Sequence, residues 1–209
     1  MGRSVRRFGV VLSLLVAAAA CSGGGGAAAP SRHKTSTAVD NGPGCQFIVA
    51  GTDKRQTVPL INQSEFLVSA SATPTVCYDK VSFVFEPGNG PDLPPAYTVQ
   101  YKNPPFLPDS RTATEDLSGV HAILEVTIFP ASVTDNRNPN NQPSTYQGNL
   151  RLALPGTRHT LIVELLRSFP EPPDPNQSVV VWLIGLDSKR PFTTDAANQP
   201  PRVNVLIMN

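Results

Sequence analysis

Along most of the chain, apolar and polar residues alternate at every second position. Between residues 78 and 86, Val81, Phe83 and Phe85 fall on one side and polar residues on the other. Similar short runs, each bounded by Pro, Gly or polar residues, cover residues 47–50, 66–70, 96–102, 121–129, 158–169 and 203–207. A period of two between such breaks predicts β-strands.

Two segments depart from simple alternation. Residues 179–186 are apolar on both sides, which predicts a central strand covered on both faces. Residues 161–167 also fit helical spacing, so a helix remains an alternative there. About eight short strands with little helical pattern predict an all-β fold, an antiparallel β-sandwich.

The start of the chain has the pattern of an export signal. Arg3, Arg6 and Arg7 precede an uncharged run, 8–20, that ends in small residues before Cys21. A membrane-spanning helix needs about 20 apolar residues, so this run is too short to be one. The small residues before Cys21 resemble a lipobox, in which the cysteine is diacylated and becomes the new N-terminus. We therefore expect a signal peptide at 1–20 and lipid attachment at Cys21; the alternative is an ordinary signal peptide with a chance cysteine.

The mature chain is expected to be a lipid-anchored domain on the extracytoplasmic face of the cell membrane. Residues 21–44, rich in Gly, Ala, Ser and Thr, predict a flexible linker that spans roughly 25 Å. Residues 45–209 are long enough for one domain with its own core. Loss of the three arginines leaves 14 basic against 16 acidic residues, which gives no electrostatic basis for binding nucleic acid.

Cys45 and Cys77 remain once Cys21 is lipidated. An exported protein meets oxidising conditions, so this pair predicts a disulfide. Two buried free thiols are the alternative.

The sequence offers little for catalysis. The histidines, His33, His121 and His159, are far apart and lack cysteine partners, so we expect no metal. Nucleotide-binding glycine motifs and a serine nucleophile elbow are absent from the sequence. The carboxylates Glu125 and Glu164 lie on alternating strands, where a solvated face is the usual explanation. We expect a non-enzymatic protein without a cofactor.

A set of short motifs resembles the AMIN-like domain of bacterial envelope lipoproteins. The matching residues are Tyr78-Asp79 with Val81 and Phe83, then Tyr97, Val99 and Tyr101, then Gly185-Leu186, Arg190-Pro191-Phe192 and Pro200-Pro201-Arg202. The resemblance covers residues 77–209. It implies a β-sandwich and, by similarity to AMIN domains proper, binding to peptidoglycan, while the AMIN-like group itself implies no defined activity.

The resulting hypothesis is a binding module for peptidoglycan or a wall-associated protein. Its predicted ligand-binding residues are Tyr78, Asp79, Arg190 and Arg202, on a polar sheet face and in the turn after the central strand. In the competing interpretation, Asp79 or Asp187 pairs with the arginines inside the fold. A carrier of a small hydrophobic ligand between the sheets is the alternative function.

The lipobox can be tested by replacing Cys21 with Ala. Because two acyl chains anchor a protein durably, we expect Cys21→Ala to release the protein from the membrane fraction or to leave it unprocessed. Fractionation and mass measurement of the exported chain check this. Unchanged processing with full membrane retention would show that Cys21 is not the anchor.

Overall fold

The computed structural model describes residues 45, 49–58, 64–88, 90–103, 117–138, 140–170 and 178–209. The predicted signal peptide and linker, with Cys21, lie outside these residues. The strands are β1 (Arg55–Gln56), β2 (Glu65–Pro74), β3 (Tyr78–Glu86), β4 (Ala96–Tyr101), β5 (Ala122–Phe129), β6 (Ala131–Ser132), β7 (Thr160–Pro170), β8 (Ser178–Leu186), β9 (Phe192–Asn198) and β10 (Pro201–Met208).

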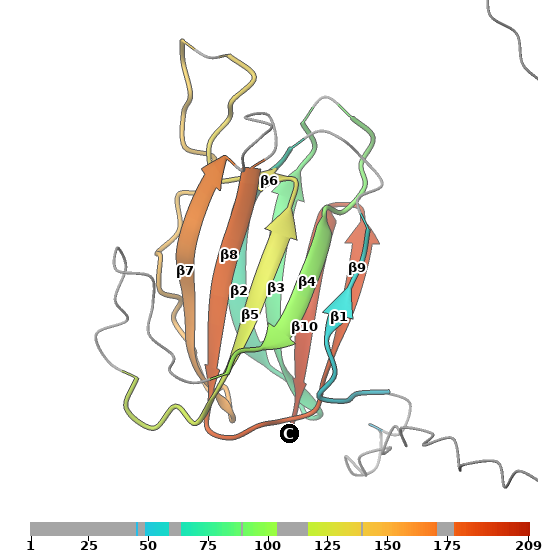
Figure 1. The fold of residues 1–209 in the computed structure, drawn as a ribbon, viewed down its shortest axis with the longest axis vertical. Helices are drawn as coiled ribbons and strands as arrows, with labels where there is room; N and C mark the ends of the chain where they lie inside the picture. Colours follow the sequence, from blue (N-terminus) through green and yellow to red (C-terminus); the bar gives the residue numbers. More distant parts are fainter. Residues whose placement is uncertain are drawn as a thin grey trace, which may run out of the picture. The chain divides into compact units, whose positions relative to one another are not determined.

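These strands form two packed sheets, with the orders β1-β4-β5-β8-β7 and β6-β2-β3-β10-β9 (Figure 1). The strand pairs are antiparallel except β2 with β6. The predicted all-β sandwich is therefore confirmed. Residues 161–167, for which the sequence left a helix as an alternative, lie within β7 and form a strand.

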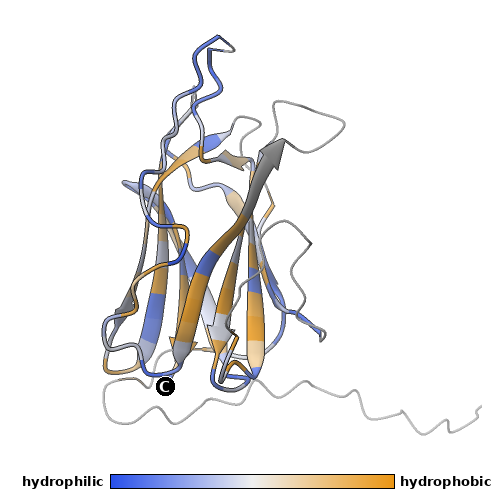
Figure 2. Cartoon of the chain, turned by 90° about the vertical axis from the view of Figure 1, so that its left-hand side faces the viewer, coloured by the Kyte–Doolittle hydropathy of each residue, from blue (hydrophilic) through white to orange (hydrophobic). Residues whose placement is uncertain are grey.

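Alternating apolar side chains from the two sheets fill the space between them. The ring of Trp182 lies 5.2 Å from that of Phe83 and 5.8 Å from that of Tyr146, measured between centroids. All three rings are buried. Figure 2 shows hydrophobic colour along the strands and hydrophilic colour on the long loops.

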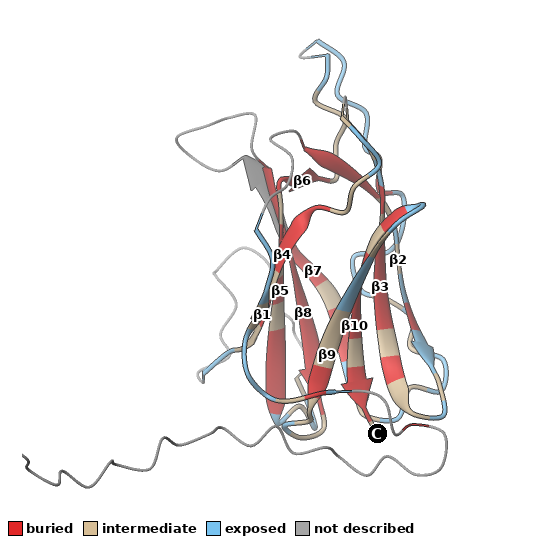
Figure 3. Cartoon of the chain, turned by 90° about the vertical axis from the view of Figure 1, so that its right-hand side faces the viewer, coloured by how far each residue is buried: buried red, intermediate tan, exposed pale blue. Residues whose placement is uncertain are grey.

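β8 is buried on both of its faces, as its continuous apolar run predicts. On the side away from the main core, Val179, Val181 and Leu183 pack with Ile123 and Leu166 in a second buried cluster. Figure 3 shows β8 buried throughout, whereas β9 is exposed or half-buried over most of its length.

The alternating pattern missed three strands. β1 and β6 have two residues each, too few to show a period. β9 is an edge strand with the sequence FTTDAAN, whose small and polar residues lack alternation. The predicted strand at 47–50 lies partly outside the described residues, and Val49 and Ala50 are not in a strand.

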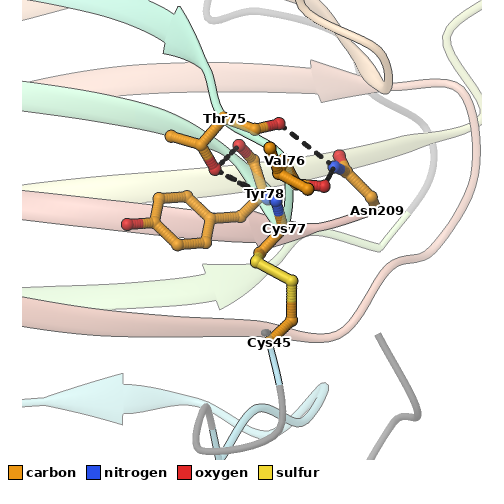
Figure 4. The surroundings of a disulfide bond; sticks show 6 residues. All are labelled: Cys45, Thr75, Val76, Cys77, Tyr78 and Asn209. Atoms are coloured by element: carbon orange, nitrogen blue, oxygen red, sulfur yellow. Dashed lines mark hydrogen bonds between the residues drawn. A yellow bond between two sulfur atoms is a disulfide. The ribbon is translucent and has the colours of Figure 1, made fainter. Parts of the chain in front are cut away.

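The predicted disulfide between Cys45 and Cys77 is confirmed, with the Cα atoms 5.6 Å apart. It joins Cys45 to the turn between β2 and β3 (Figure 4). The C-terminal residue meets the same turn, because the Asn209 side chain donates to the carbonyl oxygens of Thr75 and Val76. Both ends of the domain are thus fastened at one place.

A buried carboxylate links the two sheets near this turn. Asp79 of β3 is 0% exposed. Its oxygens accept hydrogen bonds of 2.8 to 3.0 Å from the backbone N–H groups of Arg158, His159 and Thr160, where the chain enters β7 of the other sheet. A carboxylate has four lone-pair sites and no donor, so it fits this set of donors.

We expect Asp79→Asn to lower the free energy of unfolding by about 2 to 3 kcal/mol, because the amide presents an N–H to donors that need an acceptor. Denaturant unfolding measures the loss. Asp195→Asn, on an exposed position of β9, is the matched control and should change stability by about 0.5 kcal/mol or less. Equal effects from the two variants would contradict this role for Asp79.

Candidate functional site

The outer surface of the β2-β3-β10-β9 sheet carries mostly polar side chains and is here called the polar face. Strand alternation and register place on it Ser69, Ser71 and Thr73 of β2, Lys80, Ser82 and Glu86 of β3, Thr193 and Asp195 of β9, and Arg202 and Asn204 of β10. Its charges balance, because the two cations, Lys80 and Arg202, are equal in number to the two carboxylates, Glu86 and Asp195. Such a surface suits a hydroxyl-rich or amide-rich partner better than a strongly charged one.

A row of short polar side chains crosses the middle of the polar face. Ser71 pairs with Ser82, Ser82 with Asn204, and Asn204 with Asp195. Adjacent strands lie about 4.8 Å apart, so the row is about 14 Å long. The row combines hydroxyl, amide and carboxylate groups; its two ends, Ser71 and Asp195, are exposed, whereas Ser82 and Asn204 are only 8% and 5% exposed.

Two polar atoms in and beside this row have no partner. The Oδ1 atom of Asn204 and the Nε atom of Arg202 are buried and lack a hydrogen bond to any described residue. Asn204 is 5% exposed, and both side chains leave β10 on the same side. Buried polar groups are normally paired, so an unpaired acceptor beside an unpaired donor marks a place where a ligand or water can bind.

An open groove of about 320 Å³ continues the polar face around the edge of β2. Its lining includes Ala70, Ser71 and Ala72 on one side and Tyr146, Asn149 and Leu152 on the other. The Tyr146 hydroxyl donates to the Asn149 carbonyl oxygen at 2.7 Å, which fixes that wall. Ser71 belongs both to the groove and to the polar row, so the two features are continuous.

The groove lies beside an unpaired strand edge. β6 pairs only with Glu65 and Phe66, so in the part of the chain that the structure describes, Ser69–Pro74 of β2 has no strand partner on the side away from β3. Gly148 keeps the groove wall compact, since a Cβ there would lie 2.5 Å from the Tyr146 hydroxyl oxygen. An extended peptide can add to such an edge through backbone hydrogen bonds.

Arg190 lies at the end of the sandwich and is held by internal contacts. Its guanidinium donates to Asp187 at 3.3 and 3.4 Å. The backbone N–H of Arg190 donates to the Tyr101 hydroxyl oxygen at 2.9 Å, and that hydroxyl donates to the Arg190 carbonyl oxygen at 2.5 Å. Burial raises the pKa of Tyr101 to about 12, despite the opposing effects of Arg190. The competing interpretation, in which Asp187 pairs with an arginine, therefore describes Arg190.

Asp187 contacts Arg190, His159 and Ser188, and these four residues are here called the Asp187 cluster. Its carboxylate lies 2.8 Å from Nδ1 of His159 and accepts a hydrogen bond from Ser188. Burial acts to raise its pKa, but the hydrogen bonds from His159, Arg190 and Ser188 outweigh burial and lower the pKa to about 2.

The structure does not bring the four predicted ligand residues together. Tyr78 and Arg202 lie on the outer side of one sheet, but Tyr78 pairs with Met208 and Arg202 with Val84, near opposite ends of the β3–β10 pair. Asp79 points inward and has no exposed surface.

Arg190 and Arg202, both predicted to bind the ligand, do not lie near each other. Arg190 precedes Phe192, at the start of β9, while Arg202 pairs with Ala197 near the end of that strand. The five-residue offset corresponds to about 17 Å along the strand. The antiparallel hairpin sends the two motifs to opposite ends of the sheet.

The described residues contain no cluster of three or more His, Cys, Asp or Glu residues that would hold a metal ion. Within that same part, no helix is long and apolar enough to cross a membrane. One titratable group that sequence reasoning missed is Glu65, 0% exposed at the start of β2. Burial raises its pKa to about 7, with the Gly88 backbone N–H opposing and Asp92 adding to the rise.

The chain matches no family model, no curated protein and no solved structure.

The Asp187–Arg190 pair is tested by a double-mutant cycle. A carboxyl group whose pKa falls on folding contributes stability above its unfolded pKa of 3.8, and the contribution is lost as pH falls towards 2. Both side chains are partly exposed, so we expect Asp187→Asn and Arg190→Ala to show a coupling of about 1 kcal/mol or less at pH 7.

Urea unfolding at pH 7 and near pH 2 measures this coupling. It should shrink as Asp187 becomes protonated. If Arg190→Ala leaves stability unchanged at pH 7, the pair is not structural and Arg190 becomes available again as a ligand residue.

Proposed function

We propose that this protein is a non-enzymatic, lipid-anchored module of the bacterial cell envelope that binds peptidoglycan through the polar face. The observation that carries the proposal is the unpaired Asn204 Oδ1 beside the unpaired Arg202 Nε within a row of short polar side chains. The lipid anchor at Cys21 and the AMIN-like resemblance belong to the same proposal.

The polar face has the chemistry that a glycan with N-acetyl groups requires. Sugar hydroxyls donate and accept, and acetamido groups offer one N–H and one carbonyl oxygen. Both atoms are buried, so a ligand would reach them only after the side chains shift; Asn204 Oδ1 would then accept from such a group, and Arg202 Nε would donate to one. The exposed Ser71 and Asp195 at the two ends of the row add further partners.

The groove along β2 supports peptidoglycan over a bare polysaccharide. Peptidoglycan joins glycan strands to short peptides, and the polar face is continuous with an unpaired strand edge through Ser71. The small side chains of Ala70 and Ala72 leave room there for a peptide with small side chains. A glycan on the face and a peptide in the groove would then bind as one ligand.

The carrier alternative finds less support. A ligand between the sheets would have to displace the rings of Phe83, Trp182 and Phe192, which are each less than 2% exposed. Displacing packed aromatic rings costs several kcal/mol, so a surface site is the better explanation of this fold.

The proposal is tested with purified sacculi and the exported, unlipidated chain. We expect Asn204→Ala and Arg202→Gln each to weaken binding about fivefold, as for the loss of one hydrogen bond. Because no described residue pairs with the Asn204 Oδ1 atom, Asn204→Ala should leave thermal stability nearly unchanged.

Matched controls are Gln100→Ala, in β4 of the other sheet, and Arg151→Gln, an exposed arginine outside the polar face. Neither should change binding. Sacculi treated with protease before the assay should retain binding, whereas its loss would point to a wall-associated protein. No binding by the parent chain, or equal binding by all variants, would refute the proposal.

A further inference from the structure

The disulfide determines which end of the domain the N-terminal segment leaves. Cys45 is covalently held at the β2–β3 turn, and Tyr78 beside this turn pairs with Met208 near the C-terminus. The chain from Cys45 back to Cys21 therefore starts at this end of the sandwich, here called the tether end. Fully extended, its 24 steps reach about 80 Å at most.

Exposed basic side chains gather at the tether end, on loops far apart in the sequence. Strand pairing places the end of β4, the start of β7 and the end of β8 together, because Thr160 pairs with Leu186 and Tyr101 with Leu124 beside it. The exposed cations on these loops and on the segment before β1 are Lys54, Lys102, Arg158 and Lys189.

Among the described residues, internal contacts occupy most of the carboxylates near these cations. Asp79 is buried and accepts backbone N–H groups, and Asp187 is held by His159 and Arg190. Glu125 pairs with Lys102 at 2.6 Å, and Asp53 adjoins Lys54, so these two carboxylates offset part of the positive charge.

No carboxylate among the described residues forms an ion pair with Arg158 or Lys189. The backbone of Arg158 is fixed by Asp79, while its side chain is exposed. Lys189 lies over the Tyr101 ring, with Nζ 5.1 Å from the ring centroid, and is also exposed. Both project from turns that are rigidly held.

We infer that the tether end is a membrane-contact surface, on which Arg158 and Lys189, with Lys54 and Lys102, bind the phosphates of anionic lipid headgroups. The inference rests on the proposed lipid anchor, because the tether is what keeps this end near lipid. Each basic residue adds only weak attraction, but a tethered surface meets the membrane at high effective concentration.

Contact at the tether end would orient the whole domain. The strands would lie roughly perpendicular to the membrane surface. The polar face and the groove, which run along β2, β3 and β10, would then extend away from the membrane. Strands of nine residues, such as β3 and β8, are about 30 Å long. The proposed wall ligand would thus be met above the lipid, not at its surface.

Vesicle flotation of the chain lacking residues 1–20, with Cys21→Ser, tests the surface without the lipid anchor. This chain keeps all ten strands and the Cys45–Cys77 disulfide. We expect binding to phosphatidylcholine vesicles containing phosphatidylglycerol, little binding to pure phosphatidylcholine, and loss of binding at high salt. Arg158→Glu with Lys189→Glu should weaken binding to the anionic vesicles about tenfold or more.

Arg137→Glu with Arg151→Glu is the control, because it makes the same change in net charge at exposed positions away from these turns. It should weaken vesicle binding much less, and an equal effect would overturn the inference. Equal binding to both vesicle types, or full displacement by millimolar inorganic phosphate, would overturn it too. Sacculus binding by Arg158→Glu with Lys189→Glu should match that of the parent chain. The two assays therefore distinguish a failure of the membrane-contact inference from a failure of the wall-binding proposal.

Discussion

The fold depends on a charge buried at one end of the sandwich. Two stacked sheets leave backbone N–H groups unpaired where the chain turns from one sheet into the other. Asp79 supplies the acceptors for three of them, at Arg158, His159 and Thr160, and so joins β3 to the entry of β7. Without Asp79 these N–H donors would lie unpaired in a low-dielectric interior, and without the donors the buried carboxylate would be an unpaired charge; both arrangements are costly in a protein. The disulfide, the C-terminus and the Asp187 cluster all lie near this junction.

The sequence contains enough to predict the longer alternating strands but not which strands lie beside one another. Alternation at Val81, Phe83 and Phe85 depends only on one strand having a buried face, so a single segment reveals it. Pairing depends on contacts between distant segments, which is why the offset between Arg190 and Arg202 was out of reach. Asp79 shows the same limit, because its partners lie about 80 residues further along the chain. The unpaired Asn204 had no signal in the sequence, since an asparagine on an alternating strand is read as solvated.

The two proposed surfaces follow from how the chain is fastened. Because the disulfide and the C-terminus meet at the β2–β3 turn, the N-terminal segment leaves the sandwich from this end. The polar face runs from that end towards the loops at the other, and within the described residues Ser69–Pro74 of its neighbouring β2 edge has no strand partner on the side away from β3. Exposed strand edges are usually protected because they invite aggregation. Here the small side chains of β2 and the wall formed by Tyr146 limit access to a narrow groove. That arrangement favours a slender extended ligand over another sheet.

A second buried carboxylate, Glu65, contrasts with Asp79. Neither of its oxygens has a hydrogen bond of ordinary geometry within the described residues, and burial raises its pKa to about 7. Its protonated form is therefore favoured by folding. Between its unfolded pKa near 4.5 and about 7, the native state keeps a proton that the unfolded chain releases, so stability falls as pH rises through this range. Asp79 is satisfied by donors built into the fold, whereas Glu65 is accommodated only by protonation. Of the two buried carboxylates, the one at the tether end is thus bonded to backbone N–H groups of the opposite sheet, whereas the one at the start of β2 is favoured in its protonated form.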